Sequence, residues 1–351
     1  MIGHLAYAAG SPCPTIVLDS SRLPQDTAKL LESLTEVRRY LAAAGGAHVL
    51  KFALMEPSEH PMFDLDYRFV QALPGGPDRF DLRGSCGHSI LSAVLAAERA
   101  GVLPKLTAGQ RIRVNVLNNG DSVVCEVDGV DRDEVQFTVY FVRPDAVPVT
   151  RLLLTGEPAT ELTVDGERHE VSLVSSGNAY VFVDARSLGL RDHGELFSAD
   201  AALFDRLSRI RVAAAGLLDW PAEGAFPKVA AIMPMEAGRI AARAISVPRW
   251  HPTIALTGAV CLGSAIQVPG TIPWRVAHEM GCVDGLIDIA TPGGDTAVTA
   301  ATADRDGGPA LLWAAAGRKR VTFQGSFLLE PLAYLHFEEI AQCLAETAMS
   351  S

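Results

Sequence analysis

The chain has 351 residues, of which 48% are hydrophobic and 20% are charged. It is long enough for two domains with sizeable cores and too apolar to be intrinsically disordered. The formal net charge of -11 at pH 7 argues against a general nucleic-acid-binding protein or a protein of anionic membrane surfaces. No segment approaches the roughly 20 uninterrupted apolar residues of a membrane-spanning helix, and residues 1–14 lack the basic start and apolar core of a secretion signal.

The cysteines are scattered along the chain without any CxxC pair. This spacing predicts neither a zinc site nor a disulfide framework, so we expect reduced thiols in a cytoplasmic protein. The six are Cys13, Cys86, Cys125, Cys261, Cys282 and Cys343.

Short apolar runs separated by turn signals such as NNGD and PGGPD predict mainly β-structure in the first half of the chain. The predicted strands are residues 14–19, 48–56, 111–118, 122–128, 135–142, 149–155 and 169–175. One long helix is predicted over residues 25–43. The first half is therefore expected to be a sheet wrapped around few helices.

The motif DLRGSCGHSI at 81–90 places a cysteine between glycines just before a predicted helix at 89–100. Apolar side chains recur in this helix near the helical period, and Ser85 or Ser89 is expected to cap it. Cys86 is then at the positive end of the helix dipole, which lowers a thiol pKa and attracts anions.

The second half of the chain repeats features of the first. Residues 10–24 and 176–190 share a glycine, a polar turn, an apolar run and then an aspartate, which is Asp19 in one and Asp184 in the other. A helical stretch follows each at a similar distance, the second one at 251–266. The repeat predicts two related halves, each a curved sheet around a central helix, with both helix N-termini facing one cleft. Such a cleft suits a ligand with two or more carboxylates.

Six motifs along the chain carry a resemblance to a known family. They are GSCGHS (84–89), SGNAYVFVDARSLGL (176–190), PKVAAIMP (227–234), HPTIALTGAVC (251–261), TPGGD (291–295) and GRKRVTFQG (317–325). Together they resemble the PrpF family of 2-methylaconitate cis-trans isomerases, which has the diaminopimelate-epimerase-like fold. The resemblance implies an α+β protein of two pseudo-symmetric domains with the active site between them and with no metal or organic cofactor. We expect the domains at 1–174, completed by the segment 333–351, and at 175–332.

The resemblance also implies a catalytic pair, Lys51 and Cys86. The family moves a proton along an allylic or enolisable system next to carboxylates. We therefore predict an isomerase of an unsaturated di- or tricarboxylate, such as an aconitate-, itaconate- or oxalomesaconate-like acid. Lys51 is predicted to remove the proton and Cys86 to assist as acid or base. A lysine acts as a base only when neutral, so this role requires a buried side chain, whereas a lysine on a strand is ordinarily a surface residue.

Further residues are expected to bind the substrate carboxylates through backbone or side-chain donors. They are Ser11, Gly87, His88, Ser89, Asn178, His251, Pro292, Gly293 and Gly294. For the two histidines the alternative is a role in helix capping, and for 292–294 it is an ordinary turn. Ser11 lies where the family usually carries Thr-Ser-Lys, and this chain has Cys13 in place of the lysine. That exchange removes a positive charge from one edge of the site.

Two other functions compete with the isomerase. An amino-acid racemase or epimerase of the same fold needs a thiol at both helix N-termini, but Cys261 comes ten residues after His251 and is expected in the core. A carboxylate-binding protein without catalysis is the third. In all cases we expect a small anionic ligand, no nucleic acid and no membrane partner, with a homodimer as the commonest assembly.

Overall fold

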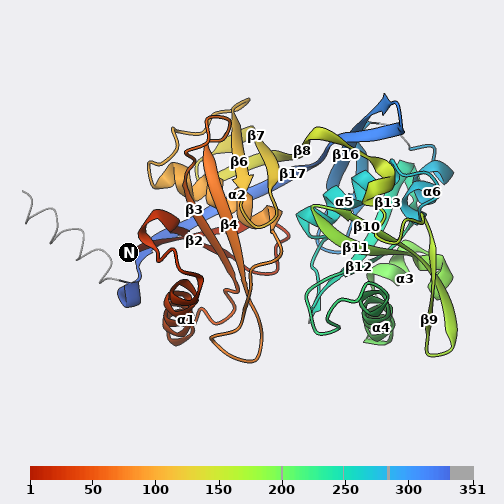
Figure 1. The fold of residues 1–351 in the computed structure, drawn as a ribbon, viewed down its shortest axis with the longest axis horizontal. Coiled ribbons are helices and arrows are strands. Elements are labelled where there is room, and N and C mark those ends of the chain that lie inside the picture. The colour runs from red at the N-terminus through yellow and green to blue at the C-terminus, as the bar shows by residue number, and fades with distance from the viewer. Residues whose placement is uncertain (199–200, 248, 283–284, 333–351) are drawn as a thin grey trace, which may run out of the picture.

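The computed structural model describes residues 1–198, 201–247, 249–282 and 285–332. In these residues a 17-stranded mixed sheet curves around helices in two lobes that lie side by side (Figure 1). The segment 333–351, expected to complete the first domain, lies outside the described residues. Among the described helices, none combines the length and the apolar character needed to cross a membrane.

The first lobe is built from eight strands and two helices. The strands are β1 (Ile2–Ala8), β2 (Thr15–Asp19), β3 (Lys51–Pro57), β4 (Leu65–Ala72), β5 (Phe80–Asp81), β6 (Arg111–Val116), β7 (Asp121–Asp131) and β8 (Glu134–Pro148). The helices are α1 (Thr27–Ala43) and α2 (Gly87–Arg99), with the 3-10 turns η1 (Ser20–Arg22) and η2 (Val149–Leu152). Residues 87–97 of α2 are all buried, so α2 is the central helix around which this part of the sheet curves.

The second lobe contains the remaining elements. Its strands are β9 (Thr160–Val164), β10 (Glu167–Ser176), β11 (Asn178–Asp184), β12 (Lys228–Met235), β13 (Arg239–Ser246), β14 (Arg249–Trp250), β15 (Ile287–Ala290), β16 (Thr296–Arg305) and β17 (Gly308–Leu328). Its helices are α3 (His193–Phe197), α4 (Ala201–Leu217), α5 (Leu256–Ile266) and α6 (Ile272–Glu279). Two 3-10 turns complete it, namely η3 (Ala185–Leu188) and η4 (Glu236–Gly238), whereas η5 (Glu330–Leu332) packs against α1 in the first lobe. Every residue of α5 is buried, as in most of α2.

The two lobes repeat one strand order, which confirms the predicted repeat. In the first, β1–β2 is antiparallel, β2–β3 parallel, β3–β4 antiparallel, β4–β6 parallel and β6–β7 antiparallel. In the second, β10–β11, β11–β12, β12–β13, β13–β15 and β15–β16 follow the same sequence of directions. Asp19 and Asp184 cap η1 and η3 equivalently, each accepting from a backbone N–H two residues on.

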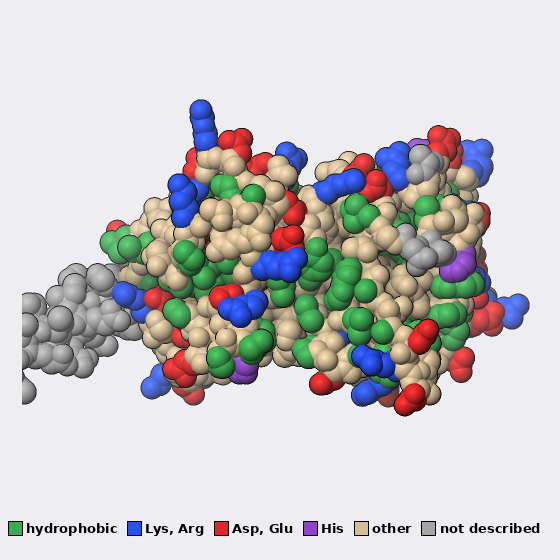
Figure 2. Space-filling view, turned by 90° about the horizontal axis from the view of Figure 1, so that it is seen from above, with side chains coloured by type: hydrophobic (Ala, Val, Ile, Leu, Met, Phe, Trp, Pro, Cys, Tyr) green, Lys and Arg blue, Asp and Glu red, His purple; other side chains and the backbone are tan. Residues whose placement is uncertain are grey.

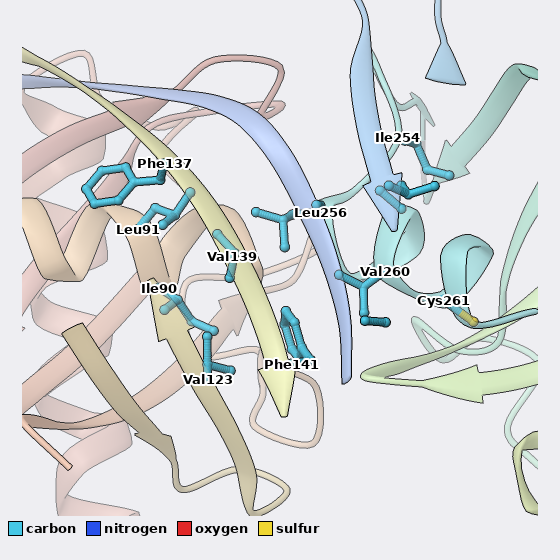
Figure 3. Close-up of a cluster of buried hydrophobic side chains, with 14 of the residues drawn as sticks. Ile90, Leu91, Val123, Phe137, Val139, Phe141, Ile254, Leu256, Val260 and Cys261 are labelled. Carbon is cyan, nitrogen blue, oxygen red and sulfur yellow. The ribbon is translucent and has the colours of Figure 1, made fainter. Parts of the chain in front are cut away.

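Strand β17 connects the lobes. Residues 308–317 pair with β16, residues 321–328 pair with β1, and β8 runs antiparallel to much of the strand. In Figure 1, β8 and β17 are the ribbons that pass between the lobes. One hydrophobic cluster continues across this junction and includes Phe141 of β8, Ile90 of α2 and Leu256 of α5 (Figure 3). The central helices of both lobes therefore share a core.

Local predictions met different outcomes. The helix at 25–43 is confirmed as α1, which begins after Asp26, whose side chain accepts from the Lys29 N–H at 3.0 Å. The predicted serine cap of α2 is wrong, because Cys86 is the N-cap residue and no side chain caps the helix. The predicted strand at 149–155 is also wrong, because it folds as η2 and contributes one isolated bridge. In the stretch 251–266 the helix begins only at Leu256.

Candidate active site

Lys51 is buried at the junction of the lobes. It begins β3 and pairs with Thr15 in the parallel neighbour β2. Only 7% of the residue is exposed, and its Nζ donates to the Ser11 hydroxyl at 2.7 Å. The Ser11 Oγ in turn donates to the carbonyl of Cys13 at 2.8 Å. Ser11 was predicted to bind substrate, but here its hydroxyl proton points to Cys13 and its oxygen orients the Lys51 amine.

Cys86 is the N-cap of α2, with extended backbone angles of φ -135 and ψ 105. Its thiol is free and partly exposed, and its carbonyl accepts from the Tyr67 hydroxyl at 3.3 Å. Burial raises the pKa of this thiol, but the Lys51 charge and hydrogen bonds with Ser89 outweigh it, so the pKa is lowered from its ordinary value. A thiol with a lowered pKa at a helix N-terminus is suited to proton transfer.

The two predicted histidines face each other across the junction. The ring of His88, in the first turn of α2, stacks on His251 with 6.1 Å between centroids and 18° between planes. His88 is 1% exposed and neither of its ring nitrogens has a hydrogen-bond partner within the described chain. His251 Nδ1 accepts from the Thr253 N–H at 3.2 Å. Burial, and then nearby lysine charges, hold the pKa of both histidines well below the ordinary value, so both rings are neutral at pH 7.

The N-termini of α2 and α5 meet where the Gly87 backbone lies against the Leu256 side chain. A Cβ at Gly87 would lie 2.4 Å from Cδ2 of Leu256, so only glycine fits there without movement. Asn178 spans the lobes, because its Nδ2 donates to the Ser85 carbonyl at 3.1 Å and to the Thr257 hydroxyl at 2.8 Å. The side chain of Asn178 therefore fixes the Cys86 turn against α5.

The remaining predicted residues lie along the same seam. The Ser89 hydroxyl is 2.9 Å from the Thr15 hydroxyl beside Lys51. Thr253, two residues after His251, donates to the Gly10 carbonyl at 3.1 Å. In the turn 292–294, which is exposed, a Cβ at Gly293 would lie 2.5 Å from the Pro252 carbonyl oxygen. The predicted residues Ser11, Gly87, His88, Ser89, Asn178 and His251 thus lie around Lys51 and Cys86, whereas the turn 292–294 approaches the site only where Gly293 lies against Pro252.

Two lysines of this site escaped the sequence analysis. Lys228 begins β12 and pairs with Tyr180 of β11, just as Lys51 begins β3 and pairs with Thr15. Burial lowers the pKa of Lys228 to about 8, and the charges of Cys86 and Lys51 act on it as well. Lys319 of β17 is 5% exposed, and burial lowers its pKa to about 8.

The repeat offered a signal for Lys228 but none for Lys319. Lys228 lies in the motif at 227–234, but α3 and α4 separate β11 from β12 where α1 alone separates β2 from β3. Because of this insertion, Lys228 follows Asp184 at a greater distance along the chain than Lys51 follows Asp19, so the repeat does not align the two lysines. Lys319 stands between Arg318 and Arg320 in a run that reads as a charged, exposed strand. Only the pairing of β17 shows that it is buried.

The second lobe has no thiol in the position of Cys86. The N-cap of α5 is Ala255, and Cys261 lies inside the helix with 0% exposure (Figure 3). Its Sγ donates to the Val174 carbonyl at 3.4 Å, and burial raises its pKa to about 12. Cys261 is therefore a core residue, as predicted. The two-thiol arrangement that the racemase alternative requires is missing from the described residues.

A surface hollow of about 760 Å³ is not part of this site. It lies over α1 and η5, where its walls are mostly polar and charged side chains such as Lys29, Glu36 and Arg39. The outline of the molecule narrows between the two lobes (Figure 2). Of the two predicted catalytic residues, Lys51 is buried and Cys86 is partly exposed.

The chain is similar to proteins of a known family. Residues 36–326 match the family described as PrpF protein. The 4-oxalomesaconate tautomerase of Pseudomonas putida is 25% identical over 282 residues, which cover 74% of this chain and 77% of that protein. The 3-methylitaconate isomerase of Eubacterium barkeri is 25% identical over 298 residues, which cover 73% and 78%.

Solved structures show the same fold. The crystal structure of methylitaconate-delta-isomerase aligns with a TM-score of 0.66 and 20% identity, over 94% of this chain and 95% of that one. A hydroxyproline epimerase from Agrobacterium vitis, with trans-4-hydroxy-L-proline bound, aligns with a TM-score of 0.61 and 16% identity, over 93% and 92%. The predicted α+β, epimerase-like fold is therefore confirmed. From its sequence match and its fold, the chain belongs to the PrpF family and is an isomerase.

Proposed function

We propose that this isomerase moves a proton within an unsaturated di- or tricarboxylate and shifts its carbon–carbon double bond. The named relatives act on 4-oxalomesaconate and 3-methylitaconate, which are acids of this class. The observation that carries the proposal is the pairing of a buried amine with an activated thiol at the lobe junction. Lys51 is held by Ser11, and its charge lowers the pKa of Cys86.

In the first step, the Lys51 ammonium passes its extra proton to the Cys86 thiolate, and the neutral Nζ takes a proton from a saturated carbon next to the conjugated system. The carbon–hydrogen electron pair then spreads over the double bond and a carboxylate as a dienolate. In the second step a proton returns to the far carbon of the same system, which completes the double-bond shift. Either the Lys51 ammonium delivers it directly, or the Cys86 thiol delivers it and the Lys51 ammonium then returns a proton to the thiolate. In both cases the amine and the thiol end as they began. Such positioned proton transfer contributes about 10²- to 10⁴-fold in rate.

The negative charge of the dienolate needs stabilisation at the same place. Backbone N–H groups at the N-termini of α2 and α5 face the junction, where Gly87 and Leu256 touch. Lys228 adds a cation close to Cys86. Preorganised donors and charges of this kind supply the largest share of rate enhancement in many enzymes.

The first prediction concerns Lys51→Met. The enzyme is incubated in D2O with 3-methylitaconate or 4-oxalomesaconate, and deuterium uptake is followed by NMR together with the change in ultraviolet absorbance. We expect Lys51→Met to lose about 10²-fold or more of the exchange rate, because it removes the base. Cys86→Ala is expected to slow the reaction as well, because it removes the second acid–base group.

Lys105→Met is the matched control, because Lys105 is exposed in the turn before β6. It should exchange deuterium at the wild-type rate. Circular dichroism of each variant verifies the fold. Exchange at full rate in well-folded Lys51→Met would remove Lys51 from the mechanism.

A further inference from the structure

The distribution of lysines in this chain is uneven. The sequence has only five lysines. Two of them, Lys29 and Lys105, are exposed, whereas Lys51, Lys228 and Lys319 lie at the lobe junction. We call these three the lysine cluster. Among the described residues, no carboxylate forms an ion pair with any member of the cluster, although arginines elsewhere pair freely.

Lys319 is turned inward by a local irregularity of β17. The register against β8 shifts between Ala316 and Lys319, and Arg318 has a positive φ of 58. The flanking arginines point outward. Arg318 lies 2.9 Å from the Asp288 carboxylate, and Arg320 lies 4.0 Å from the Glu134 carboxylate. Strand alternation then places Lys319 on the inner face, where it is 5% exposed. Its Nζ has neither a hydrogen-bond nor an ion-pair partner within the described chain.

Lys319 pairs with Phe137 of β8, which packs in the same core as α2. The lysine charges that act on the Cys86 thiol are those of Lys51 and Lys228, without Lys319. All three lysines act on the histidine pair, and among them Lys319 has the largest effect on His88, whereas Lys51 has the largest effect on His251. The site thus has a proton-transfer end at Cys86 and a second cationic end beside the unpartnered ring of His88.

We propose that Lys319 is a specificity-determining residue that binds a carboxylate of the substrate remote from the reacting carbons, next to His88. The substrate is then a tricarboxylate. The N-termini of α2 and α5 and the Lys228 ammonium bind the two carboxylates near Cys86, and Lys319 binds the third. This inference rests on the proposed function. It adds a residue role and selects the triacids from the wider class of unsaturated acids.

The chemistry of a lysine suits this task. An ammonium group offers three donors on a flexible stem, so it follows a carboxylate without the fixed fork of an arginine. The unpartnered His88 ring has one N–H to add, because it is neutral. A buried cation without a counterion is costly, and a ligand carboxylate removes that cost by supplying the counterion. The ligand, and not the protein, would complete the ion pair.

Binding of unreactive acids tests the proposal separately from catalysis. The probes are tricarballylate, which has three carboxylates, and methylsuccinate, which is tricarballylate without one terminal carboxylate. Isothermal titration calorimetry at pH 7 compares wild type, Lys319→Met and the control Lys105→Met. We expect wild type and the control to bind tricarballylate about tenfold or more tighter than methylsuccinate. Lys319→Met should lose that preference and keep its methylsuccinate affinity within about twofold.

Two results would overturn the proposal. One is a wild-type enzyme that binds both acids with equal affinity, a result that needs no variant. The other is a Lys319→Met variant that still prefers tricarballylate, or one whose affinity falls equally for both acids. Neither acid can react, so deuterium exchange stays an independent test. An enzyme that exchanges deuterium but shows no triacid preference keeps the proposed function and loses only the role of Lys319.

Discussion

The Lys319 side chain is 5% exposed, and burial lowers its pKa from 10.5 to about 8. The lowered pKa means that the charged form of Lys319 is less favourable in the folded chain than in the unfolded chain. Below pH 8 the lysine is charged in both, so its charge destabilises the fold there. Between pH 8 and 10.5 the unfolded chain holds more protons than the folded one, so stability rises with pH in that window. At about 1.36 kcal/mol per pKa unit, the full cost is on the order of 3 kcal/mol.

Lys319→Met should therefore be more stable than wild type at pH 7, by up to about 3 kcal/mol. The advantage should shrink as the pH rises from 8 to 10.5, because the wild-type lysine becomes neutral. Urea unfolding at several pH values measures both effects, with Lys105→Met as the control that gains nothing. A Lys319→Met protein that is less stable at pH 7 would show that the ammonium group has a favourable partner after all.

At the scale of single residues, the sequence was informative where a local cause or the family resemblance indicated what the side chain does. The glycines around Cys86 and the helix after it pointed to a polarised thiol, and the family resemblance pointed to Lys51. Lys228 and Lys319 also lie in two of the family motifs, at 227–234 and 317–325, but nothing in their local sequence indicates that they are buried. Their importance comes from burial without a counterion, which depends on strands that are distant in the chain.

The N-termini of α2 and α5 meet at the contact of Gly87 with Leu256 (Figure 3 shows Leu256 at the junction). A methyl group on Gly87 would come within 2.9 Å of both Cβ and Cγ of Leu256, so rotation of the leucine alone does not relieve it. We expect Gly87→Ala to push the two helices apart and to reduce kcat/KM about tenfold or more, because small misplacements in an active site are costly.

The double variant Gly87→Ala/Leu256→Ala should recover part of the loss, since it removes the clashing side chain. Gly216→Ala is the matched control, because a methyl group there meets no atom within 4 Å and favours helix α4. Steady-state kinetics of the three variants measures the effect. Full activity in Gly87→Ala would show that the junction opens without consequence.

Elements were predictable where one local cause decided them. Helix α1 has its apolar period and an aspartate cap, and both act within the segment itself. The cap of α2 was misassigned because serines favour that place, whereas here the extended backbone at Cys86 starts the helix and Ser89 bonds to Thr15. The run 149–155 is apolar enough for a strand, but Val149 and Leu152 are buried from a 3-10 turn instead.

The whole molecule is held together by pairings that cross between the lobes. Strand β17 pairs with β16, β8 and β1, and one hydrophobic cluster includes both central helices. We expect both lobes to unfold in a single transition. All four tryptophans, Trp220, Trp250, Trp274 and Trp313, lie beyond the first lobe, so their fluorescence reports the second lobe and β17. Far-UV circular dichroism reports both lobes, and the two urea curves should coincide.

Fluorescence that changes at a clearly different urea concentration from the dichroism would show two independent units. The sequence did predict two related lobes, because Asp19 and Asp184 end equivalent strands. It did not predict that β17 serves both. A strand pattern shows which side chains face inward, but it does not show which neighbours a strand pairs with.

The matching positions of Lys51 and Lys228, set against the mismatch of Cys86 and Ala255, have a consequence for stereochemistry. If both lobes carried the same acid–base groups, each face of a flat substrate would meet an equivalent set. Inversion at one carbon requires such groups on both faces. Here the amines are retained on both sides and sulfur on one side only. The faces are no longer equivalent, so the hydrogen that leaves and the hydrogen that arrives are tied to a defined side of the carbon skeleton.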